Sequence, residues 1–481
     1  MDHHEKDFVR TDKVFFQFYP QNAETERENM TDFERDKLTA EKIAEAVQSR
    51  GGRAYYVGGY VRDLICGREN KDIDIEIHGV SPACLEGILD SFGERIAIGE
   101  SFGIYNIKGY HIDIAMPRKE NARGSGHRDF DIFVDPFIGT RDAAKRRDFT
   151  VNALMQDVLS SEVIDHFGGT DDLNNGILRH VNDSSFAEDP LRVLRAAQFA
   201  ARFELTVAPE TVELCSKMQL EHLSKERIEG ELKKALLKAE KPSIFFETLR
   251  EMNQLDIWFP EIKALIGIEQ NRKYHTEGDV WNHTMRVLDA AAKYREKAEH
   301  PMGFMLAALT HDVGKAVCTE IINGELHAYA HESKGLPLAE ELLRRITNEV
   351  KLIEYALNLI ELHMKPNVIA KAKSAIKSTN KLFDSAVDPA ALIYLATADS
   401  EGTITPHSHT MYTDFLFERL EIYRSYMSRP YVMGKDLIQA GLKPSKNFSE
   451  ILDYAHKLRL AGIGKDNALK QTLAYARKLD K

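Results

Sequence analysis

The chain changes its pattern of apolar and polar residues once, near Gly169. Before that point, apolar residues alternate with polar ones or form short runs, which predicts strands at residues 54–59, 72–78, 96–100, 103–107 and 111–116. One helix is expected among these strands, at 84–92. After Gly169, apolar residues recur every three to four positions, first at 191–203, 209–223 and 228–238. The pattern predicts a mixed α/β domain followed by an all-α remainder.

This pattern divides the chain into five zones. A polar extension comes first, and an α/β head, a helical neck, a larger helical domain and a helical tail follow. We place these zones, in the same order, at residues 1–36, 37–170, 171–260, 261–429 and 430–481. The Phe259-Pro260 and Arg429-Pro430 pairs stand where linkers between the helical parts are expected.

The most informative segment joins the first two strands. The strand at 53–57 breaks at Gly58 and Gly59, and the next strand carries Asp72 and Asp74. Alternate strand residues share a face, so both carboxylates point the same way, as paired metal ligands must. Glycines let backbone N–H groups approach a phosphate with no Cβ in the way. This combination is typical of phosphoryl or nucleotidyl transfer, although glycine turns and acidic surface strands also occur without function.

Two later segments add polar groups to the same domain. Asp113 lies between two isoleucines on a predicted strand, so it faces away from the core and could join the acidic pair. A solvent-facing position is the alternative. Arg146 and Arg147 could clamp a triphosphate, and Asp148 could accept from a ribose hydroxyl. A plain basic helix start is the alternative for these three residues.

A helix that starts at Pro190 carries a polar stripe. Asp189, Arg192 and Arg195 recur every three residues and therefore share one face. They could read a nucleobase without a template, because a carboxylate accepts from an exocyclic amine and a guanidinium donates to ring acceptors. A weak surface ion pair is the alternative.

Composition narrows the class of protein. The 481 residues, 43% hydrophobic and 29% charged, are expected to form two to four globular domains. No apolar run has membrane-spanning length, and the N-terminus is charged where a signal peptide would be apolar. Four scattered cysteines without a CxxC pair imply neither disulfides nor a zinc knot, so a reduced, cytoplasmic protein is expected.

The net charge of −11 argues mildly against a nucleic-acid partner. However, residues 141–147 and 456–481 are locally basic, and an acidic enzyme can hold RNA on one basic face. Solvated helix surfaces explain the C-terminal stretch equally well.

Four ordered motifs carry a family resemblance. GGYVRD, DID, RRDFTVNAL and EDPLRVLRAA resemble the motifs of class II nucleotidyltransferases, which include bacterial tRNA nucleotidyltransferases (CCA-adding enzymes) and poly(A) polymerases. The resemblance covers about residues 50–240, and GKDLIQAGLKPS at 434–445 is similar to a tail segment of the tRNA enzymes. It implies a polymerase-β-like head in which Asp72 and Asp74 hold Mg²⁺, with Asp113 as the third carboxylate.

The resemblance also implies which residues contact the incoming nucleotide. They are spread over the four motifs: Gly58, Gly59, Arg62, Arg147, Asp148, Asn152, Asp189, Arg192 and Arg195. Of these, Asp189 and Arg192 would read the base. Family members often have an arginine where this chain has Gln198, which removes one cation from the nucleotide side.

The helical half has its own constellation. His283 lies in one helical run, His311 and Asp312 end another, and Asp399 closes a third. Such ligands on packed helices can hold one or two divalent metals, although each residue alone is more often a cap or part of the core. Their order resembles the HD-type metal-dependent phosphohydrolases. This implies a divalent transition metal such as Mn, Ni or Fe and hydrolysis of a phosphomonoester or a 2′,3′-cyclic phosphate.

Further polar residues surround this set. Lys315 stands where the HD family often has a basic residue. Five others could bind a second metal or the substrate phosphate, or be polar surface: His275, Glu277, Asp279, His331 and His363.

Together these features predict template-independent addition of C and A to tRNA 3′ ends from CTP and ATP, with a phosphohydrolase attached. A subset of bacterial tRNA nucleotidyltransferases carries an HD domain, whereas the related poly(A) polymerases end in a strongly basic tail, so the moderately basic tail favours tRNA. One alternative is a poly(A) polymerase or an enzyme that adds only CC or only A. Another is a nucleotide phosphohydrolase whose head only binds nucleotide or RNA. The oligomeric state stays open.

Overall fold

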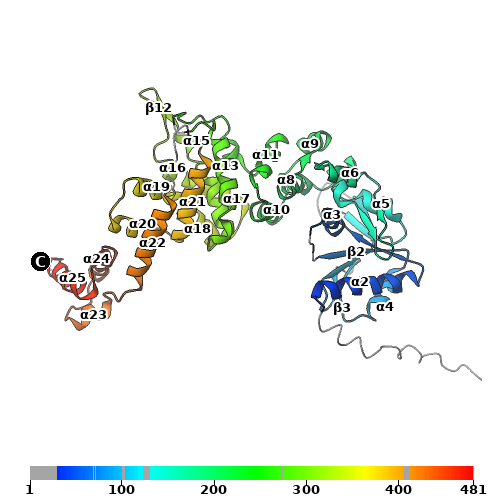
Figure 1. Ribbon diagram of the computed structural model, residues 1–481, viewed down its shortest axis with the longest axis horizontal. Coiled ribbons are helices and arrows are strands. Elements are labelled where there is room, and N and C mark those ends of the chain that lie inside the picture. The colour runs from blue at the N-terminus through cyan, green and yellow to red at the C-terminus, as the bar shows by residue number, and fades with distance from the viewer. Residues whose placement is uncertain are drawn as a thin grey trace, which may run out of the picture. The chain divides into compact units, whose positions relative to one another are not determined.

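The computed structural model describes residues 30–68, 70, 72–99, 103–122, 130–273, 275–405 and 412–479 (Figure 1). Most of the predicted extension, residues 1–29, lies outside these ranges. The chain separates into two compact units. The first contains residues 1–175 and 179–186, and the second contains residues 176–178 and 187–481.

The first unit is built on a mixed sheet of seven strands in the order β3-β4-β5-β2-β1-β8-β9. β2 and β5 are parallel, and the other neighbours are antiparallel. The strands are β1 Arg53–Val57, β2 Ile73–His78, β3 Arg95–Gly99, β4 Ile104–Ile107, β5 Ile112–Ala115, β8 Met155–Asp157 and β9 Val163–Ile164. A separate hairpin consists of β6 Arg118–Ala122 and β7 Phe130–Val134. The sequence pattern indicated β1 to β5 but not β6 to β9.

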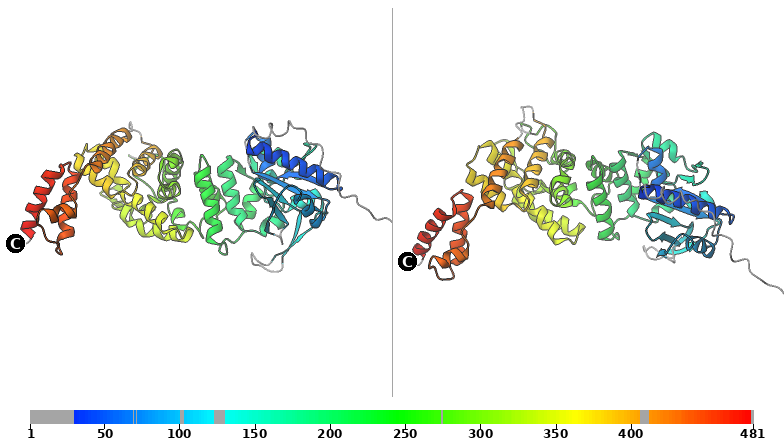
Figure 2. Two further views of the ribbon diagram at one scale, coloured as in Figure 1. Left: turned by 90° about the horizontal axis from the view of Figure 1, so that it is seen from below. Right: turned by 60° about the horizontal axis from the view of Figure 1, so that its bottom comes forward.

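Helices cover the sheet (Figure 2). They are α2 Asp32–Gln48, α3 Gly59–Ile65, α4 Pro82–Leu89, α5 Gly139–Lys145, α6 Gly169–Asn174 and α7 Asp183–Ala187, with a 3₁₀ turn η2 at Thr150–Asn152. The isoleucines of β2 pack into one apolar cluster with residues of α2 and α4, including Ile43 and Leu85. Tyr55 and Val57 of β1 pack in a second cluster with Met155. The alternation along the strands therefore leaves the acidic residues of β2 on the face opposite its isoleucines.

The head begins earlier than the sequence pattern indicated. α2 starts at Asp32, where Thr31 and Glu34 form a capping box. Asp36 is buried and accepts a 2.9 Å hydrogen bond from the backbone N–H of His111. Residues 32–36 are thus part of the folded head and not of a polar extension. Their polar composition hid the helix, because its apolar buried face starts only after Asp36.

The second unit starts with the neck helices. They are α8 Leu191–Phe203, α9 Pro209–Ser216, α10 Lys225–Lys238, α11 Ser243–Glu251 and α12 Pro260–Lys263. α8 packs on α10 and α11, and two short strands, β10 Ile177–Leu178 and β11 Thr206–Val207, pair in parallel. At the predicted linker, Phe259 is fully buried against the rings of Phe245 and Phe246, so the chain at this position is packed and not an exposed linker.

A bundle of helices follows. Its elements are α13 Val280–Ala292, η3 Arg295–Lys297, α14 Pro301–Thr310, α15 Lys315–Cys318, α16 His331–Lys334, α17 Leu336–Ile346, α18 Val350–Leu362, α19 Met364–Lys371, α20 Ile376–Ser385, α21 Pro389–Gly402 and α22 Thr413–Ser428, with a hairpin of β12 Glu320–Ile322 and β13 Glu325–His327. α14 is apolar almost throughout and is surrounded by α13, α18 and α21. Its last turn therefore delivers the next two residues, His311 and Asp312, to the centre of the bundle.

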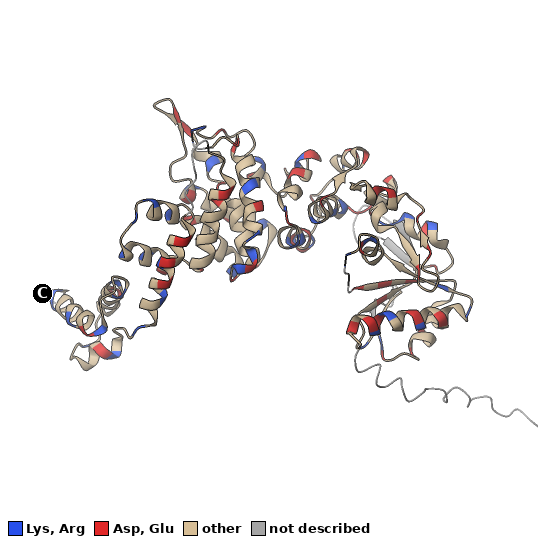
Figure 3. Cartoon of the chain, in the orientation of Figure 1, with Lys and Arg blue, Asp and Glu red and all other residues tan. Residues whose placement is uncertain are grey.

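The chain ends in three helices, α23 Gly434–Gln439, α24 Phe448–Leu460 and α25 Lys465–Leu479, which share a small apolar cluster. Acidic and basic residues are interspersed over most helices (Figure 3). Among the described residues, no helix has the length and apolar character needed to cross a membrane. All four cysteines are free thiols. The prediction of an α/β head followed by a helical remainder is confirmed, apart from the short strands β10 to β13.

Candidate functional site

The turn after β1 brings backbone, carboxylate and guanidinium together in the head. Gly58 has φ +66° and ψ −132°, a conformation that side chains rarely allow. A Cβ at this position would lie 3.3 Å from Nη1 of Arg147 and 3.8 Å from Oδ2 of Asp74. Glycine at this turn therefore lets the Arg147 guanidinium come close to the backbone, and the approach of a phosphate to the backbone N–H groups stays a prediction.

The structure places two of the predicted carboxylates side by side. Asp74 on β2 and Asp113 on β5 are direct neighbours in the parallel register, so their side chains share a face. Burial and then the charges of Asp113 and Asp72 raise the pKa of Asp74 to about 6, although Arg147 opposes this rise. Burial and the neighbouring carboxylates thus disfavour the ionised form of Asp74, and a bound cation would offset both effects. Mg²⁺ is commonly held by one or two carboxylates together with waters and substrate phosphates.

The other two carboxylates of this site lie nearer the solvent. Asp72 stands just before β2 and is exposed. Asp113 is exposed as well and accepts a hydrogen bond from Asn106 Nδ2 at 3.1 Å. Within the part of the chain that the structure describes, every cluster of three metal-ligand atoms within 4.8 Å lies in the second unit. The three head carboxylates are therefore spaced more widely than the metal-ligand atoms of the helical bundle.

A hydrogen-bonded chain links three of the predicted nucleotide-binding residues. Arg62 is buried, and its Nη1 donates to Oδ1 of Asn152 at 2.7 Å. Asn152 Nδ2 in turn donates to Oδ1 of Asp148 at 3.0 Å. Arg62 also donates to Asp63 at 2.8 Å. The motifs GGYVRD and RRDFTVNAL thus meet through side chains that lie far apart in sequence.

Sequence reasoning missed Glu76, which holds the arginine pair of this site. Its Oε2 accepts from Nη2 of Arg147 at 3.2 Å and of Arg146 at 3.4 Å. Burial by itself would raise the pKa of Glu76, but the hydrogen bond from His78 and the charges of both arginines outweigh it and lower the pKa to about 2. Glu76 is therefore ionised and positions Arg147. The sequence could have indicated Glu76, because it continues the alternation of acidic residues that starts with Asp72 and Asp74.

The polar stripe on α8 belongs to the second unit. Asp189, Arg192 and Arg195 are half-buried, whereas the residues between them are mostly buried. Asp189 accepts from Nη2 of Arg227 on α10 at 2.8 Å and from the backbone N–H of Leu191 at 3.0 Å. Arg227 was also missed, since nothing in the local pattern links α8 to α10.

Two further α8 residues have defined surroundings. The Arg195 guanidinium lies 5.3 Å from the ring centroid of Phe199 and 4.0 Å from buried Glu231. Gln198 is only 1% exposed, and its Nε2 has no hydrogen-bond partner within the described chain. The amide is thus buried at the position where the resemblance in the sequence led us to expect an arginine.

In the helical bundle, all four predicted HD residues converge. Nε2 of His283 lies 3.1 Å from Oδ1 of Asp399 and 3.4 Å from Oδ2 of Asp312. Nε2 of His311 lies 3.9 Å from Oδ1 of Asp399 and 3.3 Å from Oδ2 of Asp312. His283, His311 and Asp399 form one cluster with a ligand atom from each within 4.8 Å of the others.

A second cluster adjoins the first. Asp312, His331 and His363 meet the same distance criterion. Oδ1 of Asp312 lies 3.2 Å from Nε2 of His331 and 4.0 Å from Nε2 of His363. Asp312 therefore turns one oxygen to each cluster, as a carboxylate between two metals does. We call these six residues the HD centre: His283, His311, Asp312, His331, His363 and Asp399.

Hydrogen bonds at Nδ1 orient the imidazoles of the HD centre. His311, His331 and His363 each donate from Nδ1 to the carbonyl oxygen three residues earlier, at 2.7–3.0 Å. His283 Nδ1 is 3.1 Å from Glu277 Oε1. This leaves Nε2 of each ring directed to the centre, the arrangement usual for metal-bound histidine.

Unsatisfied buried atoms support metal binding at this centre. Nε2 of His283 and Nε2 of His311 are buried and have no hydrogen-bond partner among the described residues. Burial by itself would raise the pKa of Asp312, but the charges of His311 and Lys315 hold it well below its usual range. An ionised buried carboxylate surrounded by imidazoles fits a divalent transition metal.

The outer candidates separate into two groups. Nζ of Lys315 lies 2.7 Å from Oδ2 of Asp312, so it touches the centre. Glu277 accepts from both His275 and His283, at 2.8 and 3.1 Å. Asp279, in contrast, caps α13 by accepting from the backbone N–H of Asn282, which is a structural role.

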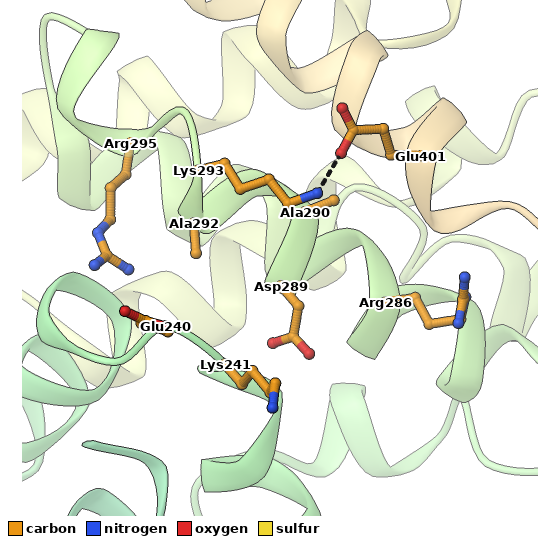
Figure 4. Close-up of a pocket in the computed structure, with 9 residues that line it drawn as sticks. All are labelled: Glu240, Lys241, Arg286, Asp289, Ala290, Ala292, Lys293, Arg295 and Glu401. Atoms are coloured by element: carbon orange, nitrogen blue, oxygen red, sulfur yellow. Dashed lines mark hydrogen bonds and ion pairs between the residues drawn. The ribbon is translucent and has the colours of Figure 1, made fainter. Parts of the chain in front are cut away.

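A hollow of about 790 Å³ with several charged residues in its lining lies beside α13 (Figure 4). Its basic residues are already bound. Lys293 pairs with Glu401 at 2.8 Å, and Arg295 donates to the carbonyl of Ala239 at 2.6 Å. Lys241 pairs with Glu204 at 2.6 Å. These contacts explain the charges of the hollow, and we assign it no ligand.

Family profiles cover the segments that contain both sites. Three family profiles match the chain: "Poly A polymerase head domain" at residues 54–179, "Probable RNA and SrmB-binding site of polymerase A" at 204–266 and "HD domain" at 280–400. The first contains the head carboxylates and both arginines, and the third contains the whole HD centre.

Whole-length relatives identify the family. A "Multifunctional CCA protein" of Actinobacillus pleuropneumoniae is 35% identical over 337 residues, which cover 67% of this chain and 80% of the relative. One from Pasteurella multocida is 33% identical over 435 residues, covering 88% of this chain and 97% of the relative. The solved Thermotoga maritima CCA-adding enzyme in complex with tRNA shares the fold, with a TM-score of 0.61 at 20% identity and coverage of 91% and 95%. The chain therefore belongs to the multifunctional CCA protein family, as a nucleotidyltransferase that carries an HD domain.

Proposed function

We propose that this protein adds C and A residues to tRNA 3′ ends, with CTP and ATP as substrates and no template. The observation that carries the proposal is the neighbouring Asp74 and Asp113 pair, set beside Arg147 at the Gly58 turn. Family membership supports CCA addition, and the similar fold of an enzyme solved with tRNA supports a tRNA substrate. We place the reaction in the cytoplasm, where tRNA and both nucleotides occur.

In the head, Asp72, Asp74 and Asp113 would hold Mg²⁺. When bound, the ions activate the RNA 3′-hydroxyl and stabilise the charge of the leaving pyrophosphate. The 3′-oxygen forms a bond to the α-phosphorus, the bond to pyrophosphate breaks, and the hydroxyl proton goes to solvent. Glu76 holds Arg147 where a phosphate can bind, and burial keeps Arg62 in place.

We propose nucleotide contacts for residues of each unit. Gly58, Gly59, Arg62 and Arg147 would contact phosphates, and Asp148 and Asn152 the ribose. Asp189 and Arg192 would read the base, with Arg195 nearby. Arg227 would keep Asp189 in place, since it donates to that carboxylate at 2.8 Å.

We also propose four domains at residues 37–170, 171–260, 261–429 and 430–481, with α2 added to the first of them.

Stepwise addition tests the proposal. The protein is incubated with tRNA ending before CCA, at C or at CC, with CTP and ATP supplied separately, and the 3′ ends are sequenced. Addition of CC from CTP and then a single A from ATP is expected. Growth beyond one A would indicate a poly(A) polymerase, and addition from one nucleotide only would indicate a partial enzyme.

Substitution of the carboxylates tests the head residues. Asp72→Asn and Asp74→Asn are each expected to abolish addition, because an amide is a poor Mg²⁺ ligand, while tRNA binding stays close to normal. Filter binding of labelled tRNA provides the control. Incorporation at the wild-type rate in either variant would contradict the assignment.

We propose a second activity at the HD centre: hydrolysis of a phosphomonoester or a 2′,3′-cyclic phosphate. Two metals would bind, one at His283, His311 and Asp399 and one at His331 and His363, with Asp312 between them. When bound, they supply a nucleophilic water at neutral pH. Lys315 is placed to bind a phosphate oxygen near Asp312. The imidazole-rich ligand set favours Mn, Ni or Fe over Mg.

Metal analysis and turnover test this second activity. Purified protein is expected to contain or take up close to two divalent ions and to release phosphate from adenosine 3′-phosphate in their presence. His311→Ala is expected to lose both properties and to retain nucleotide addition. The absence of both bound metal and metal-dependent release would overturn the proposal.

A further inference from the structure

The hairpin of β12 and β13 has both ends anchored at the HD centre. Before it, Lys315 lies 2.7 Å from Oδ2 of Asp312. After it, Nε2 of His331 lies 3.2 Å from Oδ1 of the same carboxylate. Gly314 packs so closely against the carbonyl of His331 that a Cβ would collide with it. The segments on both sides of the hairpin, which is labelled β12 in Figure 1, therefore contact the proposed metal site.

An aromatic pair consists of His327, the last residue of β13, and Tyr329, in the segment that joins the hairpin to His331. Tyr329 is 61% exposed and lies two residues before the metal-site residue His331. Its ring is stacked on His327, with centroids 4.9 Å apart and planes at 12°. Ala330, which lies between Tyr329 and His331, has φ +59°, a left-handed conformation that is uncommon for alanine. The tyrosine ring is therefore held in a defined orientation although most of its surface meets solvent.

A large, oriented ring that is open to solvent can receive a ligand with a flat apolar face. Nucleobases are such ligands, and they stack on tyrosine whatever their sequence. The Cα atoms of Tyr329 and His331 are at most about 7 Å apart, which is comparable with the size of one nucleotide, so the ring lies on the same short segment of chain as a residue of the HD centre.

We propose that Tyr329, backed by His327, stacks on the base of a nucleotide whose phosphate is hydrolysed at the HD centre. The inference rests on the proposed phosphohydrolase activity and names a residue that would favour substrates with a base. The substrates are nucleoside phosphates, free or at the end of an RNA, and not phosphate esters that lack a base.

The same hairpin offers a matched control. Glu320 pairs with His327 and Ile321 with Leu326 in the β12–β13 register. Directly paired residues share a face and adjacent residues do not, so Ile321 lies on the face opposite His327. Ile321 is 72% exposed, and Ile321→Thr removes an exposed apolar group from the hairpin without touching the stacked pair. Threonine keeps the β-branch that suits a strand.

The test compares two substrates that release phosphate in the same assay. Adenosine 3′-phosphate carries a base, whereas glycerol 2-phosphate presents a similar secondary ester without a ring. Tyr329→Leu is expected to lower kcat/KM for adenosine 3′-phosphate, relative to glycerol 2-phosphate, by about 5- to 100-fold, as loss of one base-stacking aromatic does. Tyr329→Phe keeps the ring and should retain the wild-type ratio, as should Ile321→Thr.

An unchanged ratio in Tyr329→Leu overturns the inference while leaving the hydrolase in place. An equal change in Ile321→Thr also overturns it, because the effect then belongs to the hairpin as a whole. If the wild type hydrolyses neither substrate, the hydrolase proposal fails separately. Calorimetric titration with adenosine 3′-phosphate then decides the stacking site, which equal affinities of wild type and Tyr329→Leu would refute.

Discussion

Replacing Asp74 with asparagine should stabilise the metal-free protein while it destroys nucleotide addition. Burial and the charges of Asp113 and Asp72 raise the pKa of Asp74 from 3.8 to about 6. A raised pKa means that folding disfavours the ionised form of this carboxyl. The stability that Asp74 contributes is therefore complete below about pH 4 and is lost as the pH rises through about 6. Asparagine resembles the protonated form and avoids this loss.

The size of the effect follows from the two pKa values. A change from 3.8 to about 6 corresponds to about 3 kcal/mol at pH 8, since each tenfold change in proton affinity is worth about 1.4 kcal/mol. Asp74 is only partly buried, so water and salt screen the repulsion. We therefore expect a net stabilisation of about 1–2 kcal/mol. For a domain of this size, that raises the midpoint of thermal unfolding by about 2–8 °C.

Scanning calorimetry of the full chain in EDTA measures this shift. The transition assigned to the head is compared at pH 8 and pH 5, because a chain of several domains does not unfold in one step. The advantage of Asp74→Asn should fall to about half at pH 5. Asp72→Asn is the matched control, since Asp72 is exposed and its replacement should change stability by at most about 0.5 kcal/mol. A lower midpoint in Asp74→Asn, or an equal gain at both pH values, would refute the electrostatic argument.

Three further outcomes are expected. Glu76→Gln leaves two arginines without their buried counter-charge, so it should weaken CTP and ATP binding and lower stability by about 1–3 kcal/mol, as calorimetric titration and thermal unfolding can check. Glu277→Gln weakens the hydrogen bond between residue 277 and Nδ1 of His283, so the affinity for the metal should fall about 10- to 100-fold in chelator competition. An unchanged metal affinity would show that this hydrogen bond does not matter. Asp312→Asn should lose both metals, whereas His331→Ala should lose one; mass-spectrometric metal counts distinguish these outcomes, and an equal loss in both variants would contradict a carboxylate shared by two ions.

The local sequence pattern correctly placed functional residues on one face where those residues belong to a single strand or helix. The alternation of isoleucines and acids in β2 is readable directly, because side chains alternate across a strand whatever its surroundings. The same reasoning located the strand of Asp113 and the stripe on α8. It failed at α2, where polar residues open a helix whose buried face begins only at Asp36.

The ordered motifs of the sequence determined the two chemistries of this protein, a nucleotidyltransferase head and an HD domain. Tertiary structure alone decided how their residues meet. Arg62 contacts Asn152 across 90 positions, and Asp312 lies between two histidine clusters that come from different helices. Such contacts depend on strand register and helix packing, which buried apolar surfaces set collectively and which no local period encodes. The sequence therefore indicates which groups are present, and the packing determines which of them share a site.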